Sequence, residues 1–407
     1  MPPNSGKIKL FIFNPTCEMA IANGTISWSA NKHLQQFEKD LEYLPLLFTS
    51  GNDLLAVHRY PSAIFNEWLN KTLKLKPKLI DRAHLTADIE KNGSFPDELH
   101  PWGWSPAMHN ELKYLKSYTS ADFEKSPSSQ WKAESKSFYG RSTALELLKT
   151  IVAQYPHDKF LPYRYHPEVA NSTEAVEKLF EKWPKLVLKA PWSASGRGIQ
   201  ILRYGYLNTS NRQWINSVLK QQGHIMVEPL LNKTMDFSMH FHIYRNHIQY
   251  VGYGEFKTNK NGQYEQNIIK PNIKNSHSSA WIETLAKKIK EALLINGIDK
   301  RYEGYAGVDL MHVKINDESY IHPFVEVNWR YNMGLIALQL EQFIHSEAGG
   351  SFHIHINPQK PFSEIHNQLV NDYPLILQND LPLAGYFPLS DPDKAVSGAY
   401  VILTPNR

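Results

Sequence analysis

The sequence predicts a protein of mixed α/β and α+β class. Its 407 residues exceed what one ordinary hydrophobic core holds, which indicates two or three subdomains. In the first quarter of the chain, short apolar runs alternate with helix-like segments, the order typical of a small α/β domain. Later segments alternate apolar and polar residues over longer stretches, as antiparallel strands do, and are interspersed with amphipathic helices.

The composition is that of an ordinary globular protein. Apolar residues make up 42% and charged residues 21% of the chain, and the net charge of +4 indicates no nucleic-acid partner. No stretch is long and apolar enough to span a membrane, and the N-terminus lacks the apolar core of a signal peptide. The single cysteine, Cys17, excludes an intrachain disulfide. We therefore expect a cytoplasmic protein.

The first part of the chain contains the pattern of a small α/β domain. Residues 8–13 are mostly apolar and stop at Asn14-Pro15, which predicts a buried strand followed by a turn. The polar residues that follow, Asn14, Glu18 and Asn23, lie either at the ligand-binding edge of a sheet or in turns and caps. Further strands are predicted at 46–49 and 54–57, and helices at 36–44 and 63–73.

A serine-rich segment at 117–136 has the composition of a linker. We place a domain boundary there, which gives an N-terminal domain at 1–125 and a central domain at 137–345. Residues 346–407 are predicted to form a C-terminal extension packed on the central domain. From residue 357 onward this extension holds seven of the 25 prolines and no motif of its own.

Residues 185–200 carry the pattern of a phosphate-binding hairpin. Three apolar residues predict a buried strand that ends at Lys189. The small residues at 193–198 then allow backbone amides to approach a polyanion closely, and residues 199–202 return as a strand. No helix and no Lys-Ser/Thr pair follows the glycines, so this is not a Walker-type loop. The alternative is a glycine-rich turn with an incidental lysine.

The central region continues with clear helix and strand patterns. Residues 224–231 are an apolar strand that carries Glu228 and ends at Pro229, where pairing stops. Antiparallel strands are predicted at 236–243 and 249–256. Helices are predicted at 141–155, 172–183, 211–222 and 279–296.

Two later strands carry the acids of a candidate metal site. Asp309 lies in the apolar strand 305–313, where an unpaired carboxylate would be very costly to bury. Glu326 and Asn328, two residues apart in strand 320–332, point to the same face. Three oxygen donors on neighbouring strands suit Mg²⁺, which keeps water or substrate phosphate in its other positions. A structural ion pair is the alternative.

These motifs, in this order and spacing, resemble the ATP-grasp superfamily, which includes D-alanine-D-alanine ligase, biotin carboxylase and glutathione synthetase. The resemblance covers residues 137–345. It implies two α+β subdomains that grip ATP, preceded by a small α/β domain at 1–125. It also implies an ADP-forming ligase that phosphorylates a small-molecule carboxylate and joins it to an amine or another nucleophile. ATP and Mg²⁺ are the implied cofactors.

The resemblance implies a role for each motif residue. Lys189 and Arg330 would act in catalysis, and Lys189 with Arg141 would contact the nucleotide phosphates. Asp309, Glu326 and Asn328 would hold magnesium. The remaining nucleotide contacts would be Ser193, Ser195, Gly196, Arg197 and Gly198 in the phosphate loop, Glu228 and Leu230 at the adenine, and Asp236 at the ribose.

Two features depart from the family pattern. Gly307 stands where the D-alanine ligase branch has an arginine, so Arg330 or Arg197 would supply that charge. The first 125 residues fit the superfamily only in general pattern, and substrate identity is therefore not implied. A small-molecule kinase and a nucleotide-binding module without turnover are the alternative functions. His240 and His242 are either a general base or packing residues.

Overall fold

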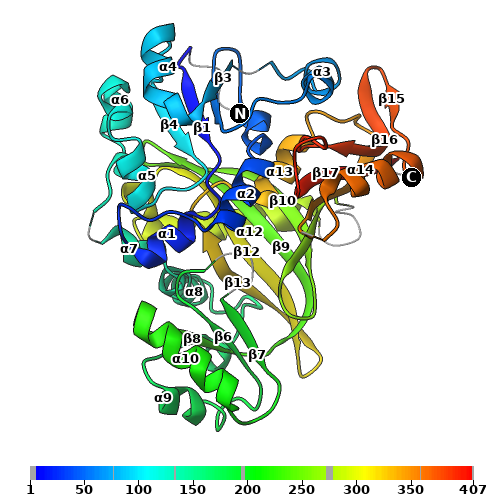
Figure 1. Cartoon of the computed structure of the whole chain (residues 1–407). Helices are drawn as coiled ribbons and strands as arrows, with labels where there is room; N and C mark the ends of the chain where they lie inside the picture. The colour runs from blue at the N-terminus through cyan, green and yellow to red at the C-terminus, as the bar shows by residue number, and fades with distance from the viewer. Residues whose placement is uncertain are drawn as a thin grey trace.

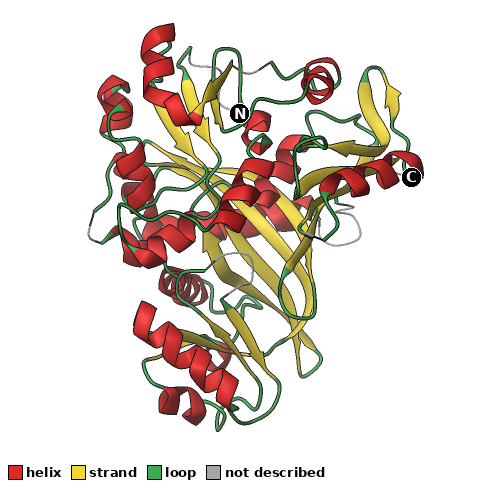
Figure 2. Ribbon diagram, viewed as in Figure 1, coloured by secondary structure: helices red, strands yellow, loops and turns green. Residues whose placement is uncertain are grey.

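The computed structural model describes residues 6–76, 78–132, 134–193, 198–271, 278–357 and 359–405. They form three sheets with helices on their faces (Figures 1 and 2). The predicted mixed α/β and α+β class is confirmed, because one sheet is wholly parallel and the other two are antiparallel. Within the described ranges, no helix is both long and apolar enough to cross a membrane.

The N-terminal region is a four-stranded parallel sheet in the order β3-β2-β1-β4, drawn in blue and cyan at the top of Figure 1. Its strands are β1 (Lys9–Ile12), β2 (Leu54–Val57), β3 (Lys78–Asp81) and β4 (Glu98–Pro101). Its helices are α1 (Cys17–Asn23), α2 (Lys32–Asp40), α3 (Ala63–Lys71), α4 (Leu85–Asn92) and α5 (Pro106–Glu111), with short 3₁₀ helices at Arg82–His84 and Leu115–Tyr118.

The prediction of a strand at 46–49 is wrong. Leu44–Phe48 is a 3₁₀ helix with Pro45 in its first turn, and all five of its residues are buried. A short apolar run that is buried on every side has no period, so its hydrophobicity alone does not distinguish a strand from a helix.

The serine-rich segment packs against the rest of the molecule. It forms α6 (Ala121–Glu124), a 3₁₀ helix (Pro127–Ser129) and α7 (Ser135–Phe138). Ser120 and Ser126 cap the first two of these elements. The buried Ser128 hydroxyl donates to the Glu303 carbonyl at 2.7 Å and accepts from the Glu303 amide at 2.9 Å. Its serines therefore make caps and contacts that a mobile linker would lack.

A small antiparallel sheet carries the predicted phosphate hairpin (bottom of Figure 1, green). Its order is β5-β8-β6-β7, with β5 (Glu168–Ala170), β6 (Leu186–Lys189), β7 (Ile199–Leu202) and β8 (Ile225–Pro229). The helices α9 (Thr173–Lys178) and α10 (Thr209–Gln222) pack on it. A 3₁₀ helix at Tyr163–Tyr165 precedes β5.

The largest sheet has nine antiparallel strands in the order β13-β12-β9-β10-β11-β14-β17-β16-β15. The predicted C-terminal extension joins it through β14, which pairs with β11. The strands are β9 (Asn232–Tyr244), β10 (His247–Thr258), β11 (Tyr264–Ile269), β12 (Gly304–Ile315), β13 (Glu318–Asn328), β14 (Ala348–His355), β15 (Ile376–Gln378), β16 (Leu381–Pro388) and β17 (Gly398–Pro405). The associated helices are α8 (Arg141–Gln154), α12 (Ser279–Ile295), α13 (Met333–Leu340) and α14 (Phe362–Asp372), with a 3₁₀ helix at Ile298–Lys300.

Successive side chains along β9 point alternately into the hydrophobic core and toward the candidate site. Phe237, Met239 and Phe241 are fully buried in the core shared with α8 and α12. The intervening Ser238 and His240 point to the opposite face, because successive strand residues alternate. That face lies toward α13 and the N-terminal region, and it carries the candidate site.

Candidate active site

Arg141, the first residue of α8, connects the predicted phosphate hairpin to the predicted metal strand. Its Nε donates to the Ala190 carbonyl at 3.0 Å and its Nη2 to Ser193 Oγ at 3.2 Å. Its Nη1 lies 2.7 Å from Glu326 Oε2. Burial opposes the charge, but Glu326 and its hydrogen bond keep the pKa of Arg141 above its usual value. One buried guanidinium thus holds both motifs together.

Asp309 and Glu326 stand opposite each other on the paired strands β12 and β13. Burial, and then the Glu326 charge, raises the pKa of Asp309 to about 8. Two carboxylates that share a buried site repel each other until a cation neutralises them. The chemistry of this pair is therefore suited to bind a divalent metal ion. Asn328 adds an amide and donates from Nδ2 to Asp309 Oδ2 at 3.0 Å.

The side-chain amide of Asn328 would be needed to complete a magnesium site with three protein ligands. Among the described residues, no group of three or more His, Cys, Asp or Glu side chains has the arrangement of a metal site. A third protein ligand would therefore be the Asn328 carbonyl oxygen, a type of donor that magnesium accepts. In the structure this oxygen accepts from Arg330 Nη2 at 2.9 Å.

Arg330 is held from three directions. Besides Asn328, its Nη1 donates to the Tyr331 carbonyl at 3.2 Å, and its Nε donates to Glu18 Oε1 at 3.0 Å. Burial raises the pKa of Glu18 and the Arg330 charge opposes that rise. The other Glu18 oxygen is buried and has no hydrogen-bond partner among the described residues. Glu18, from α1, is thus part of the site, although sequence reasoning placed it only at an edge that either binds a ligand or forms turns.

Lys189 at the end of β6 pairs with Glu228 on the adjacent strand β8, with 2.7 Å between Nζ and Oε2. The side chains are 7% and 10% exposed. The Leu230 amide donates to the Lys185 carbonyl at 2.9 Å, which fixes the chain after β8. Asp236 accepts from Thr258 Oγ1 at 2.8 Å and forms an ion pair with Lys233.

Only part of the predicted phosphate loop is described. Ser193 contacts Arg141, as given above. At Gly198 a Cβ would meet Ser193 Cβ at 2.3 Å, so this position requires glycine because the two ends of the loop approach closely. The predicted contacts Ser195, Gly196 and Arg197 lie outside the described residues.

The predicted histidines are buried. His240 Nε2 lies 2.9 Å from Ser238 Oγ, and burial lowers the pKa of His240 to about 3. Burial likewise lowers the pKa of His242 to about 4. Sequence reasoning did not identify His322, a buried residue of β13 whose pKa is lowered by burial and then by the Lys189 charge. The only feature of the sequence that could have pointed to His322 is its position on the strand that also carries Glu326.

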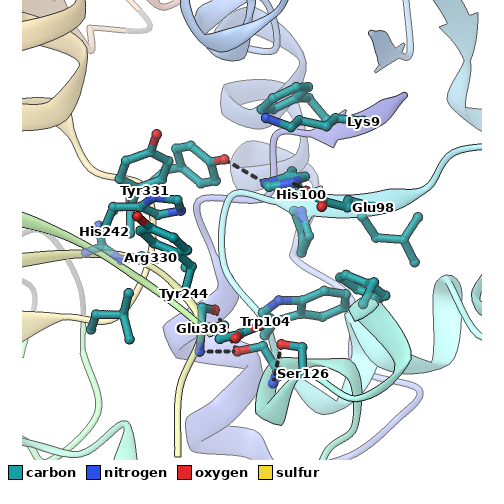
Figure 3. Close-up of a pocket in the computed structure, with 18 of the residues that line it drawn as sticks. Lys9, Glu98, His100, Trp104, Ser126, His242, Tyr244, Glu303, Arg330 and Tyr331 are labelled. Atoms are coloured by element: carbon teal, nitrogen blue, oxygen red, sulfur yellow. Dashed lines mark hydrogen bonds and ion pairs between the residues drawn. The ribbon is translucent and has the colours of Figure 1, made fainter. Parts of the chain in front are cut away.

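Two cavities meet the wall formed by Trp102 and Arg330. The metal-side cavity, about 600 Å³, is lined by Asp309, Glu326 and Asn328 among other residues. The second cavity, about 520 Å³, is lined by aromatic and charged side chains of β1, β4, β9 and β12 (Figure 3). The two cavities thus lie at different places along the sheet, with Arg330 between them.

A hydrogen-bonded chain crosses the second cavity to Arg330. Lys7 Nζ donates to Glu98 Oε1 at 3.1 Å, and Glu98 Oε2 lies 3.1 Å from His100 Nε2. His100 Nδ1 lies 2.9 Å from the Tyr331 hydroxyl (Figure 3). The Tyr331 carbonyl in turn accepts from Arg330. The N-terminal sheet therefore supports the position of this arginine.

No protein-family model and no curated protein matches the sequence. Solved structures are similar in fold. A biotin carboxylase from Campylobacter jejuni is 13% identical, with a TM-score of 0.53 over 99% of this chain and 89% of that one. The biotin carboxylase domain of 2-oxoglutarate carboxylase from Hydrogenobacter thermophilus is 10% identical, with a TM-score of 0.53 over 98% and 86%.

A carboxyaminoimidazole ribonucleotide synthase from Aspergillus clavatus is 11% identical, with a TM-score of 0.50 over 98% of this chain and 94% of that one. These similarities extend over nearly the whole chain. This chain has the ATP-grasp fold.

Proposed function

We propose that this protein is an ATP-dependent, ADP-forming ligase that acts on a small-molecule carboxylate. A carboxylate oxygen takes the γ-phosphoryl group of ATP, which gives an acylphosphate and ADP. A nucleophile then attacks the carbonyl carbon, phosphate leaves, and the nucleophile loses its proton. An amine nucleophile, and so a carbon–nitrogen bond, is the form we favour.

The contact of Arg141 with both Ser193 and Glu326 carries this proposal. Phosphoryl transfer depends mainly on positioning and charge neutralisation. A phosphate bound at Ser193 would lie beside Arg141, and the metal carboxylates would be its next neighbours. Lys189 would supply a second cation, from the strand that leads into the same loop.

Asp309, Glu326 and Asn328 would hold magnesium, which when bound neutralises charge on the phosphates and the transferring group. Arg330 would orient the substrate carboxylate and stabilise its developing charge, since Glu18 and Asn328 fix its guanidinium. The names of the similar structures support this assignment: the Hydrogenobacter domain is a complex with MgADP and bicarbonate, and the Aspergillus enzyme is complexed with ATP.

Two further assignments belong to the proposal. Residues 1–125, 137–345 and 346–407 would be the N-terminal domain, the ATP-grasp domain and its extension. The extension continues the large sheet through the β11–β14 pairing, which supports its attachment to the ATP-grasp domain. The activity would be cytoplasmic.

The test is incubation with Mg-ATP and a library of acids combined with amines. ADP and phosphate should form together, only with the correct pair, and Arg330→Met should abolish this release. AMP and pyrophosphate would contradict the acylphosphate route. A phosphorylated product without free phosphate would indicate a kinase. Nucleotide binding without turnover across the library would indicate a binding module.

A further inference from the structure

The metal-side cavity has few charged residues in its described wall. Among its described lining residues the charged side chains are Asp309, Glu326 and Arg330, all of which belong to the site above. The rest of the described wall is neutral. It combines apolar side chains with amides and hydroxyls, among them Asn259 and Gln263.

The apolar part of this wall is built from several elements. Six of its members are Met19 from α1, Leu34 and Phe37 from α2, Phe256 from β10, Met333 from α13 and Ile354 from β14. Each is only half-buried, so apolar surface remains in contact with solvent inside a concave site. Apolar surface gathered in a cavity beside charged groups is typical of a ligand pocket.

The apolar wall lies next to the arginine that would orient a carboxylate. Arg330 lines both cavities, but only the metal-side cavity also contains Asp309 and Glu326. A substrate whose carboxylate meets Arg330 on the side of these two acids therefore has its remaining atoms in the metal-side cavity. A second carboxylate or a phosphate on that remainder would have no cation in the described wall, and burying such a group unpaired is unfavourable. An uncharged apolar group would cover the exposed wall instead.

We propose that the acid substrate is a monocarboxylate with a neutral, mainly apolar body, such as a branched aliphatic or aromatic group, bound against Leu34, Phe37 and Ile354. This inference rests on the proposed function, because Arg330 is taken as the carboxylate contact. Leu34, Phe37 and Ile354 are then the residues that determine specificity.

Isothermal titration in the presence of Mg-ADP tests binding separately from turnover. The probes are straight-chain acids from acetate to hexanoate, 3-phenylpropionate, and the dicarboxylates succinate and glutarate. Affinity should rise about fourfold for each methylene group buried, by the usual value for apolar transfer. Each dicarboxylate should bind at least tenfold more weakly than the monocarboxylate of equal length. Affinity that stays flat along the series, or equal binding of dicarboxylates, would overturn the proposal.

Leu34→Lys adds a matched variant. Leu34 lies on the wall but in none of the hydrophobic cores of the described structure, so the fold should tolerate a lysine. The variant should keep its affinity for Mg-ADP, lose at least tenfold in affinity for hexanoate and gain affinity for glutarate. The control is Ile64→Lys on α3, where the side chain is 75% exposed and outside the cavity lining. An unchanged preference in Leu34→Lys would remove α2 from the substrate pocket and overturn the assignment.

Measurements of binding and of turnover test the pocket assignment and the ligase reaction separately. Acids that bind in the predicted order without release of ADP and phosphate would refute the ligase reaction and leave the pocket assignment standing. Turnover restricted to dicarboxylates or phosphorylated acids would refute the pocket assignment and leave the reaction standing. Binding of none of the probes would also refute the pocket assignment.

Discussion

Lys189 and Glu228 form a buried ion pair, with 2.7 Å between Nζ and Oε2. They lie on adjacent strands of the small sheet, at the point where β6 leads into the phosphate hairpin. Removing one member of a buried pair leaves the other charge without compensation, whereas an exposed pair contributes little. The pair therefore has a structural role that must be separated from any role in binding ATP.

Lys189→Met should lower the free energy of unfolding by about 3 kcal/mol, because Glu228 is left buried and unpaired. Denaturant unfolding measures this. The control is Lys71→Met, which breaks the pair of Lys71 and Glu67, whose side chains are 75% and 60% exposed. That variant should change stability by less than about 1 kcal/mol.

The double variant Lys189→Met/Glu228→Leu should recover most of the stability, since two apolar side chains of similar size can replace a buried pair. It should still bind ATP at least tenfold more weakly than the wild type, because the phosphate would lose a cation. Calorimetric titration with Mg-ATP measures this affinity. Wild-type affinity in the stable double variant would rule out Lys189 as a phosphate contact.

Glu326→Gln should reduce magnesium-dependent turnover by about 10²-fold or more, since the metal loses a charged ligand. The amide can still accept a hydrogen bond from Arg141, so the fold should survive. Phosphate release is measured over a range of Mg²⁺ concentrations. The control is Glu318→Gln on the same strand, whose carboxylate is paired only with the exposed Lys159 and with Tyr320 among the described residues. Wild-type activity at limiting Mg²⁺ would mean that the metal site is elsewhere.

Local patterns predicted most strands between residues 137 and 345. The strand that ends at Lys189, its return at 199–202 and the strand that ends at Pro229 all form where the apolar runs indicated. The antiparallel strands predicted at 236–243 and 249–256 form as β9 and β10, and the hairpin between them turns at Arg245 and Asn246, both with left-handed φ values. These features depend on residues close in sequence.

The features that the sequence did not reveal depend on distant contacts. Arg141 on α8 reaches Glu326, and Glu18 on α1 reaches Arg330, only because helices that are distant in the sequence lie close to β13 and the residues after it in the folded chain. The pairing of β14 with β11 likewise joins two strands that lie far apart in the sequence. Periodicity identifies an element and its buried face but not the partner it meets.

Glu98 should make stability depend on acid pH. The hydrogen bond from His100 lowers the pKa of Glu98 to about 2, with a further contribution from Lys7. A carboxyl whose pKa is depressed in the folded state stabilises the fold above its unfolded pKa, about 4.3, and loses that contribution as pH falls through the folded pKa. The free energy of unfolding should therefore decrease between about pH 5 and pH 2, by on the order of 2–3 kcal/mol from this group.

Glu98→Gln should remove that part of the pH dependence, which is measured by denaturant unfolding at a series of pH values. Glu181→Gln, at an exposed position, is the control and should keep the wild-type slope. Equal slopes in Glu98→Gln and the wild type would show that the contacts with His100 and Lys7 do not persist in solution. The hydrogen-bonded series from Lys7 to Arg330 would then lack its contacts at Glu98.

Gly307→Ala should destabilise the protein by about 1–3 kcal/mol, the usual cost of overpacking. A Cβ at this position would meet Asn332 Nδ2 at 2.5 Å, and the Asn332 side chain caps α13 by accepting from the Leu335 amide at 3.0 Å. The control is Gly205→Ala, where a Cβ meets nothing within 4 Å and stability should change by less than about 0.5 kcal/mol. Thermal and denaturant unfolding compare the two variants, and equal stabilities would show that Asn332 moves aside without cost.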